Sequence, residues 1–187
     1  MALAVNGAVA TASSTNGPGF MPSTVIDNKR TGAGWGAGGG WNDATAGTSL
    51  PDWIQINFAG VQAIDHVVVY SVQDNYLNPD RADGFDEVPA SRNYQFPAQG
   101  FDGANWVTLA TVNGNDLVKR TVSFAPHRTD RIRINILGAL STWSRVTEVE
   151  ARPGQPRRRR PTSRSPRTAS VATASSTNGT GLPSRRP

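Results

Sequence analysis

Residues 34–58 read GWGAGGGWNDATAGTSLPDWIQINF, a glycine-rich loop with two tryptophans followed by an apolar segment that indicates the fold class. From Trp53 to Phe58 apolar and polar residues alternate after the first pair, which is the period of a strand with one buried face. The glycines ahead of Trp41 permit turns that residues with a Cβ resist. Such a run also suits a flexible linker, but its two tryptophans favour a binding loop, because exposed aromatic residues in a linker promote aggregation.

The same alternating pattern recurs along the chain as far as residue 151. Turn sequences such as Asp102-Gly103 and Asn113-Gly114 separate the segments, and no helical stripe is present. Pro97 predicts an edge strand or a bulge, since proline cannot donate a ladder hydrogen bond. Further strands are expected at residues 9–14, 64–72, 94–101, 106–112, 117–124, 131–136 and 146–150. About eight strands of this kind predict an all-β fold, an antiparallel β-sandwich or jelly roll.

Charge divides the chain of 187 residues into two parts. Residues 1–151 hold ten Lys and Arg against fourteen Asp and Glu, whereas residues 152–187 hold nine Arg and no acid. A basic pI suggests nucleic acid or an anionic surface as a partner. Because the acidic part is the expected folded domain, that argument applies to the tail alone. The chain has no cysteine, which excludes disulfides and thiolate metal sites.

An internal repeat defines the domain boundaries. The sequence VATASSTNG occurs at residues 9–17 and again, unchanged, at residues 171–179. We therefore expect a domain at 1–151, a Pro/Arg/Ser-rich linker at 152–170 and the truncated, disordered start of a second copy at 171–187. The linker is either a basic arm for an anionic polymer or a segment altered by a reading-frame slip. The repeat also indicates a larger multi-domain protein, which we expect outside the cell or at its surface, although residues 1–9 lack the features of a signal peptide.

Four segments in one order resemble the coagulation factor V/VIII type C, or discoidin, domain, and are most similar to its bacterial branch, the family 32 carbohydrate-binding modules. They are residues 25–31 (VIDNKRT), 38–45 (GGGWNDAT), 51–58 (PDWIQINF) and 144–150 (SRVTEVE). The resemblance implies a galactose-binding-like jelly roll that binds a glycan or polysaccharide through loops at one end and has no catalytic activity. Residues 81–93 and Pro97-Ala98 depart from the family pattern.

The resemblance also implies a structural calcium ion. Ca²⁺ prefers about six to eight oxygen ligands, with carboxylates and backbone carbonyls mixed. The positions that match the family's ligands are Asp27, Thr31 and Glu148, together with carbonyl groups near Thr24, Lys29 and Thr147. Without a metal, Asp27 would cap its loop and Glu148 would pair with an arginine.

A sugar site needs an aromatic face for the C–H side of the ring and polar groups for its hydroxyls. Trp53 and Trp106 are expected in the core. The aromatic face is expected from Trp35, Trp41 and Trp143, and the hydroxyl partners from Asn42, Asp43, Asp74, Asn75, Tyr76 and Arg145. Two of these have alternatives: Tyr76 would serve as a loop anchor, and Arg145 as a salt-bridge partner of Glu150.

Enzyme activity and other kinds of binding are the alternatives to sugar binding. His66 lies in an expected strand and His127 in a turn, so no catalytic constellation of His, Ser and Asp is apparent, and we expect no enzyme activity. A protein- or lipid-binding adhesion module of the discoidin type is the alternative. Loops rich in Gly, Asn and Asp argue against insertion into a membrane, and the acidic domain argues against a specific nucleic-acid partner.

Overall fold

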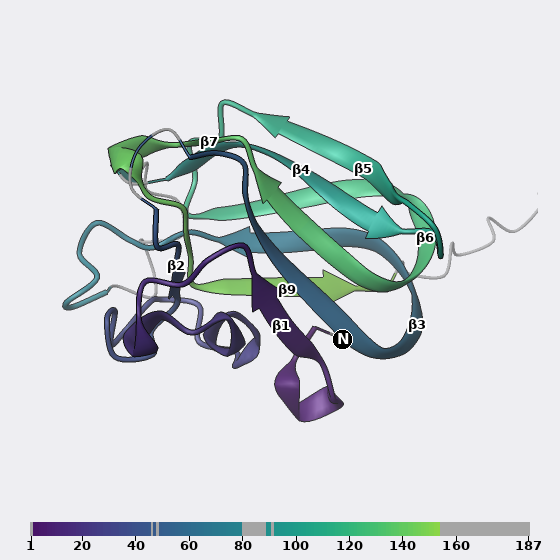
Figure 1. Cartoon of the computed structure of the whole chain (residues 1–187), viewed down its shortest axis with the longest axis horizontal. Helices are drawn as coiled ribbons and strands as arrows, with labels where there is room; N and C mark the ends of the chain where they lie inside the picture. Colours follow the sequence, from purple (N-terminus) through teal and green to yellow (C-terminus); the bar gives the residue numbers. More distant parts are fainter. Residues whose placement is uncertain (1, 46, 48, 80–88, 91, 154–187) are drawn as a thin grey trace, which may run out of the picture. The chain divides into compact units, whose positions relative to one another are not determined.

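Two long antiparallel strands, β3 (Asp52–Tyr70) and β6 (Lys119–Ile136), run through the whole domain (Figure 1). The sequence predicted each of them as two separate strands, and that prediction is wrong. Residues 59–63 and 125–130 stay extended within the sheet instead of forming loops. Register shifts between Asn57 and Gln62 and between Ile64 and His66 bend the strands, as β-bulges do. Each strand therefore contributes its two halves to two different layers.

The computed structural model describes residues 2–45, 47, 49–79, 89, 90 and 92–153. The linker from residue 154 onward and the repeated segment at 171–187 lie outside the described residues, as does most of the divergent segment at 81–93. The expectations for those segments stay predictions.

The strands form an antiparallel β-sandwich of the jelly-roll class, as the alternation predicted. The main sheet has the order β1-β3-β6-β4-β5, while β9 pairs with the second half of β3 and β7 pairs with β4. A small separate sheet consists of β2 and β8. The remaining strands are β1 (Val9–Ala12), β2 (Trp41–Asn42), β4 (Asn93–Phe101), β5 (Trp106–Asn113), β7 (Gly138–Ala139), β8 (Arg145–Val146) and β9 (Glu148–Arg152).

Helices in the described part of the chain are short 3₁₀ segments: η1 (Ala4–Asn6), η2 (Pro18–Phe20), η3 (Pro22–Ile26) and η4 (Leu140–Thr142). Within the described ranges, none is long and apolar enough to cross a membrane. The turns η2 and η3, the β2 strand and the segment that follows β3 gather at one end of the sandwich, on the left of Figure 1. That end carries most of the residues that the sequence nominated for binding.

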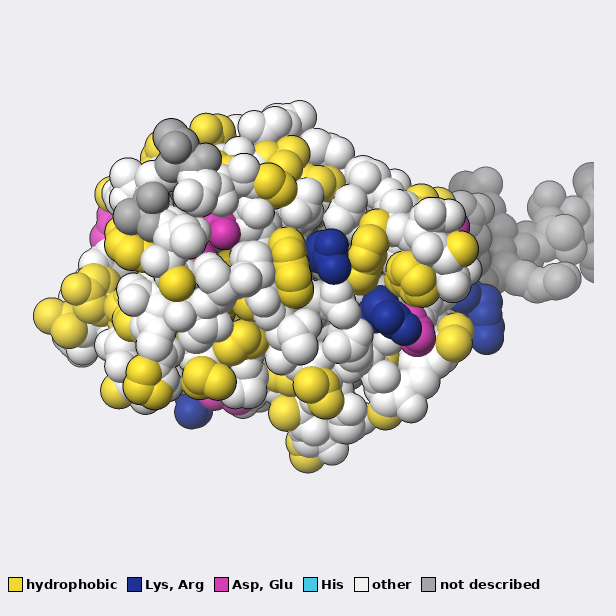
Figure 2. Space-filling view, in the orientation of Figure 1, with side chains coloured by type: hydrophobic (Ala, Val, Ile, Leu, Met, Phe, Trp, Pro, Cys, Tyr) yellow, Lys and Arg dark blue, Asp and Glu magenta, His cyan; other side chains and the backbone are white. Residues whose placement is uncertain are grey.

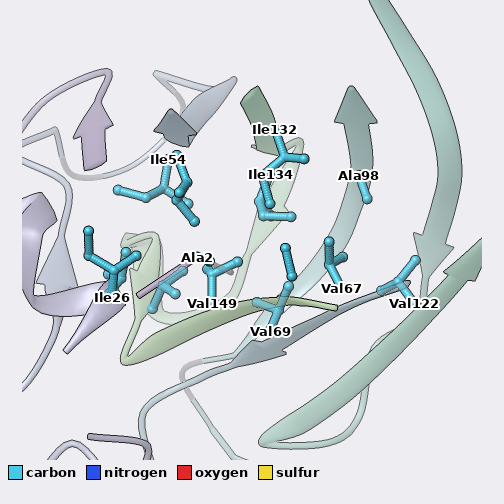
Figure 3. Packing of buried hydrophobic residues seen from close by; sticks show 14 of the residues in the cluster. Ala2, Ile26, Ile54, Val67, Val69, Ala98, Val122, Ile132, Ile134 and Val149 are labelled. Atoms are coloured by element: carbon cyan, nitrogen blue, oxygen red, sulfur yellow. The ribbon is translucent and has the colours of Figure 1, made fainter. Parts of the chain in front are cut away.

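The core lies between the two layers (Figure 3). Ile54, Ile132 and Ile134 come from the layer that contains β1 and β4, and Val67, Val69 and Val149 come from the opposite layer. All are almost fully buried. The alternation within residues 53–58 and 131–136 places these residues on one face, so the predicted buried faces are confirmed.

Two expectations for the main sheet need correction. Pro97 lies opposite Thr111 in β4, which is an inner strand between β6 and β5, and at the register shift that follows Ala98 the extra residue is Leu109 of β5. Trp53 and Trp106 are not core residues: both are half-buried. In β3 the inward positions belong to Ile54 and Ile56, so the alternation turns Trp53 to the outer face.

Candidate functional site

The loop end of the sandwich is joined by a pairing between segments about a hundred residues apart. Strand β2 pairs with β8 through Trp41 opposite Val146 and Asn42 opposite Arg145. Beyond β2, the Asp43 N–H donates to the Ser144 carbonyl (3.1 Å). The loop that follows β2 therefore lies against residues 143–145, and the two segments build one surface.

Trp41 does not supply an exposed ring, so its assignment to a sugar platform is wrong. Its side chain is 0% exposed and belongs to the hydrophobic core. The indole N–H donates to the carbonyl of Ser14 at 2.8 Å, so its polar atom is satisfied within the protein. Trp41 instead fastens the β2–β8 pair to the sandwich, because a buried indole needs both an apolar pocket and one acceptor.

Asn42 and Asp43 are also buried, and the expectation that they contact sugar hydroxyls is wrong. The Asn42 amide donates to the Asp43 carbonyl (2.7 Å). The carboxylate of Asp43 accepts the N–H of Ser144 (2.6 Å) on one oxygen, and the N–H (2.9 Å) and hydroxyl (3.1 Å) of Thr45 on the other. These contacts hold the shape of the loop and leave Asp43 no exposed oxygen.

Trp143 and Arg145 lie on the accessible side of the same segment. Trp143 has extended backbone angles and Arg145 is in β8. Both are half-buried, whereas Ser144 and Val146 are buried. Because side chains alternate along an extended chain, Trp143 and Arg145 point to the same side.

Arg145 provides a cationic group with unused hydrogen-bonding capacity. Its Nη1 atom is buried and has no hydrogen-bond partner among the described residues. Burial lowers the pKa of Arg145, while the nearby Asp43 and Tyr76 raise it. Tyr76 is 39% exposed, and its phenol group interacts electrostatically with the Arg145 guanidinium.

A short segment before β4 ties the neighbouring loops together. The Ala90 N–H donates to Asp74 (2.8 Å), and the Ala90 carbonyl accepts the hydroxyl of Ser141 (3.2 Å). Ser141 and Thr142 have left-handed backbone angles, with φ of 56° and 65°, which non-glycine residues adopt rarely. Asp74 is thus a loop anchor in part, whereas Asn75 is exposed.

Asn93 is a residue of this end that the sequence did not indicate. It is fully buried; its amide donates to the Arg145 carbonyl (2.7 Å) and its amide oxygen accepts the Arg145 N–H (3.2 Å). The side chain thereby pairs with β8 as a neighbouring strand would. An isolated Asn at the start of a strand carries no sequence signal of that role.

Trp35 lies in the glycine-rich loop and is half-buried. Its ring meets Phe20 edge to face at a centroid distance of 5.2 Å. A Cβ on Gly40 would lie 2.6 Å from the Trp35 ring, so Gly40 permits this close packing. Trp35 is therefore held in place, and its assignment to the sugar surface stays a prediction.

The residues proposed for calcium surround a buried carboxylate. Glu148 is 0% exposed; one of its oxygens accepts the Asn28 N–H (3.0 Å), and the other is buried with no hydrogen-bond partner among the described residues. Burial raises the pKa of Glu148 to about 8, and Asp27 adds to the rise through its nearby charge. A buried carboxylate with an orphaned oxygen beside a second carboxylate is a suitable environment for a hard cation.

The other calcium candidates have internal partners. Asp27 accepts the backbone N–H of Lys29 (2.9 Å) and lies 3.1 Å from its ammonium nitrogen. The Thr31 hydroxyl accepts the Ala33 N–H (3.4 Å). The Thr147 hydroxyl donates to the Arg30 carbonyl (2.9 Å). In the described residues no three His, Cys, Asp or Glu side chains cluster around one point, so a cation here would depend on backbone carbonyls as well.

Glu150, and not Glu148, is the arginine-paired acid of β9. Its carboxylate contacts Arg30 on one oxygen and Arg152 on the other, each at 2.5 Å. The sequence offered two ion pairs as alternatives, Arg145 with Glu150 and Glu148 with an arginine, and both are wrong. Neither pair is among the ion pairs of the described residues.

Comparisons with solved structures confirm the predicted discoidin-type fold. CpGH89CBM32-5 from Clostridium perfringens, in complex with GalNAc-β-1,3-galactose, has a TM-score of 0.57 at 15% identity over 77% of this chain and 94% of its own. Chitosan-binding module 1 of a chitosanase/glucanase from Paenibacillus sp. IK-5 has 0.57 at 21% identity over 77% and 93%. The family 32 module of C. perfringens NanJ, in complex with galactose, has 0.54 at 16% over 77% and 92%. No protein-family model and no curated protein sequence matches the chain.

Proposed function

We propose that this chain is a non-catalytic carbohydrate-binding module that holds a glycan at its loop end. The observation that carries the proposal is the arrangement of Trp143 and Arg145 on one side of an extended segment, between the buried Ser144 and Val146. The fold shared with modules described in complex with sugars supports it.

Each of these side chains has a distinct part in the proposed contact. The indole of Trp143 offers an apolar face to the C–H side of a sugar ring. Arg145 is half-buried, so the accessible part of its guanidinium donates to a ring hydroxyl. Tyr76 and Asn75 are exposed beside this surface and supply further hydroxyl contacts. Because the surface is shallow, we expect weak single-site binding, with a Kd on the order of 1 mM.

A glycan array probed with the full chain tests this proposal. We expect binding to a restricted set of glycans, loss of binding for Trp143→Ala, and partial retention for Trp143→Phe, which keeps an aromatic face. Trp41→Phe is the matched control, because it changes a buried indole at the same end. Binding that survives Trp143→Ala, or an array without any bound glycan, would reject the loop-end site.

The observation that favours a protein- or lipid-binding adhesion module instead is an exposed apolar residue in the loop after β3. Leu77 is 86% exposed and adjoins Tyr76. Co-sedimentation of the chain with liposomes, reduced by Leu77→Asp and unaffected by Trp143→Ala, would support the alternative. We expect no co-sedimentation, because one leucine buries too little apolar surface for stable membrane binding.

We further propose that Ca²⁺ binds at Glu148 as a structural ion. Asp27 and Glu148 would hold it, with the Thr31 hydroxyl and carbonyls of Thr24, Lys29 and Thr147 as further ligands. When bound, the ion would compensate the buried carboxylate of Glu148 and fasten the loop after η3 to β9. The support is the orphaned oxygen of Glu148 and the proximity of Asp27.

Thermal unfolding with Ca²⁺ and with EDTA tests the calcium proposal. The ion should raise the Tm of the wild-type chain and leave that of Asp27→Ala unchanged. Asp116→Ala is the control, because Asp116 is an exposed carboxylate in an ion pair far along the sequence from the site. Identical Tm values in Ca²⁺ and EDTA for the wild type would refute the proposal.

The chain is proposed to act as one module of a larger extracellular or cell-surface protein. The repeat at residues 171–179 supports this organisation. Tandem modules would offset weak single-site binding, because the second contact becomes intramolecular.

A further inference from the structure

The outer face of the main sheet carries a stack of two indoles and a guanidinium that are distinct from the residues of the loop-end site. The Arg133 guanidinium lies 4.4 Å from the ring centroid of Trp53 and 4.2 Å from that of Trp106. Three different strands, β3, β6 and β5, supply these residues. On the face seen in Figure 2, a Lys or Arg side chain lies between two hydrophobic side chains.

Arg133 forms no ion pair with an acidic residue in the described part of the chain. Its Nη2 donates to the neutral Gln55 (2.8 Å), its Nε is buried without a hydrogen-bond partner among the described residues, and none of their ion pairs includes it. Burial alone lowers its pKa. Arg131, two residues earlier, contrasts with it: Arg131 stacks on Phe101 at 4.6 Å and forms two bonds to Asp130.

The neighbours of Arg133 on this face are carboxamides. Gln55 of β3 and Gln99 of β4 are its direct partners in the sheet register. Both glutamines, Arg133 and the two tryptophans are half-buried, so each leaves part of its side chain accessible. Amides bind hydroxyl groups and indoles pack against sugar rings, whereas an unpaired guanidinium binds a carboxylate.

We propose that this face, defined by Trp53, Gln55, Gln99, Trp106 and Arg133, binds an acidic polysaccharide. The carboxylate of a uronic acid residue would pair with Arg133, and the flanking sugars would lie against the indoles and amides. A neutral chain would leave the guanidinium unbalanced. The segment of this chain at 152–187 does not complement the face, because it holds nine arginines and no acid.

Titration of the full chain followed by NMR tests the proposal, with a tetramer of galacturonic acid as the probe and the neutral galactose tetramer as the reference. The indole N–H signals of Trp53 and Trp106 should shift with the acidic tetramer. Arg133→Gln should weaken its binding about tenfold, the factor expected for one charge-assisted hydrogen bond. Trp143→Ala should leave this binding intact, which separates the face from the loop-end site.

Arg128→Gln is the matched control, because Arg128 is exposed on the same strand and its removal changes the net charge equally. Physiological salt limits the contribution of the basic segment. Equal losses for Arg133→Gln and Arg128→Gln, or unmoved Trp53 and Trp106 signals in the wild-type chain, would overturn the proposal. If the neutral tetramer shifts the Trp53 and Trp106 signals as much as the acidic tetramer does, the proposed preference for an acidic ligand is wrong. The wild-type titration decides the question even where a variant loses its fold.

Discussion

Asp43 offers the most detailed prediction, because the structure gives it a role opposite to the one its sequence position suggested. As a direct sugar ligand, it would affect binding and leave stability unchanged. In the structure it is 0% exposed, and its two carboxylate oxygens hold the backbone N–H groups of Ser144 and Thr45. Asp43→Ala therefore removes an internal connection between two segments of the loop end.

The size of the effect follows from these two bonds. A hydrogen bond to a charged acceptor contributes about 1.5–3 kcal/mol net, and losing the acceptor leaves the N–H of Ser144 without a partner. We expect Asp43→Ala to lower the free energy of unfolding by about 4 kcal/mol, or the Tm by roughly 10 °C for a domain of this size. Asp43→Asn keeps one carbonyl oxygen as acceptor, so about half of that loss is expected.

Urea unfolding of the three chains measures these differences, with Asp116→Ala as the control. Asp116 is exposed, and its ion pair among the described residues is a 3.5 Å contact with Arg120, so its removal should change stability by less than about 0.5 kcal/mol. If Asp43→Ala lowers the free energy of unfolding by less than about 1 kcal/mol and abolishes glycan binding, Asp43 is a sugar ligand and not a structural residue.

Three further predictions concern the same end of the molecule. Trp41→Phe should lower stability by about 2 kcal/mol in urea unfolding, because the Ser14 carbonyl loses its indole donor, and glycan binding should persist; the reverse pattern would contradict the burial of Trp41. Gly19→Ala should cost about 1–3 kcal/mol, since the added Cβ would lie 1.9 Å from the Gly36 carbonyl oxygen; an unchanged Tm would show that the two segments do not touch. EDTA should lower the Tm of the wild-type chain and not that of Asp27→Ala, and an equal response of both would exclude Asp27 as a ligand.

The fold was predictable from sequence because the period of two is a local signal. Alternation within residues 53–58 and 131–136 identified the strands and their buried faces. The continuity of β3 was not predictable, because residues 59–63 include Gly60 and contain only one residue with a strong strand preference, Val61. Only pairing with distant residues, such as Gln62 with Thr129, keeps them in the sheet.

The candidate site was less accessible to sequence reasoning. A tryptophan beside glycines indicates an exposed ring, yet β2 is only two residues long and is buried by its partner β8. The direction of the Trp53 side chain was also ambiguous, because Trp53 and Ile54 are both apolar and only one of them can face inward. Conversely, the side of Trp143 and Arg145 follows from alternation once the burial of Ser144 and Val146 is known.

The loop-end site is tested most directly by the five tryptophan indole signals of the full chain during titration with a glycan that the array identifies. Assignment by single Trp→Phe variants distinguishes them. We expect the Trp143 signal to shift in proportion to the bound fraction, while the Trp41 signal, from a buried indole bonded to Ser14, stays in place. A saturable shift of Trp41 with Trp143 unmoved would contradict it.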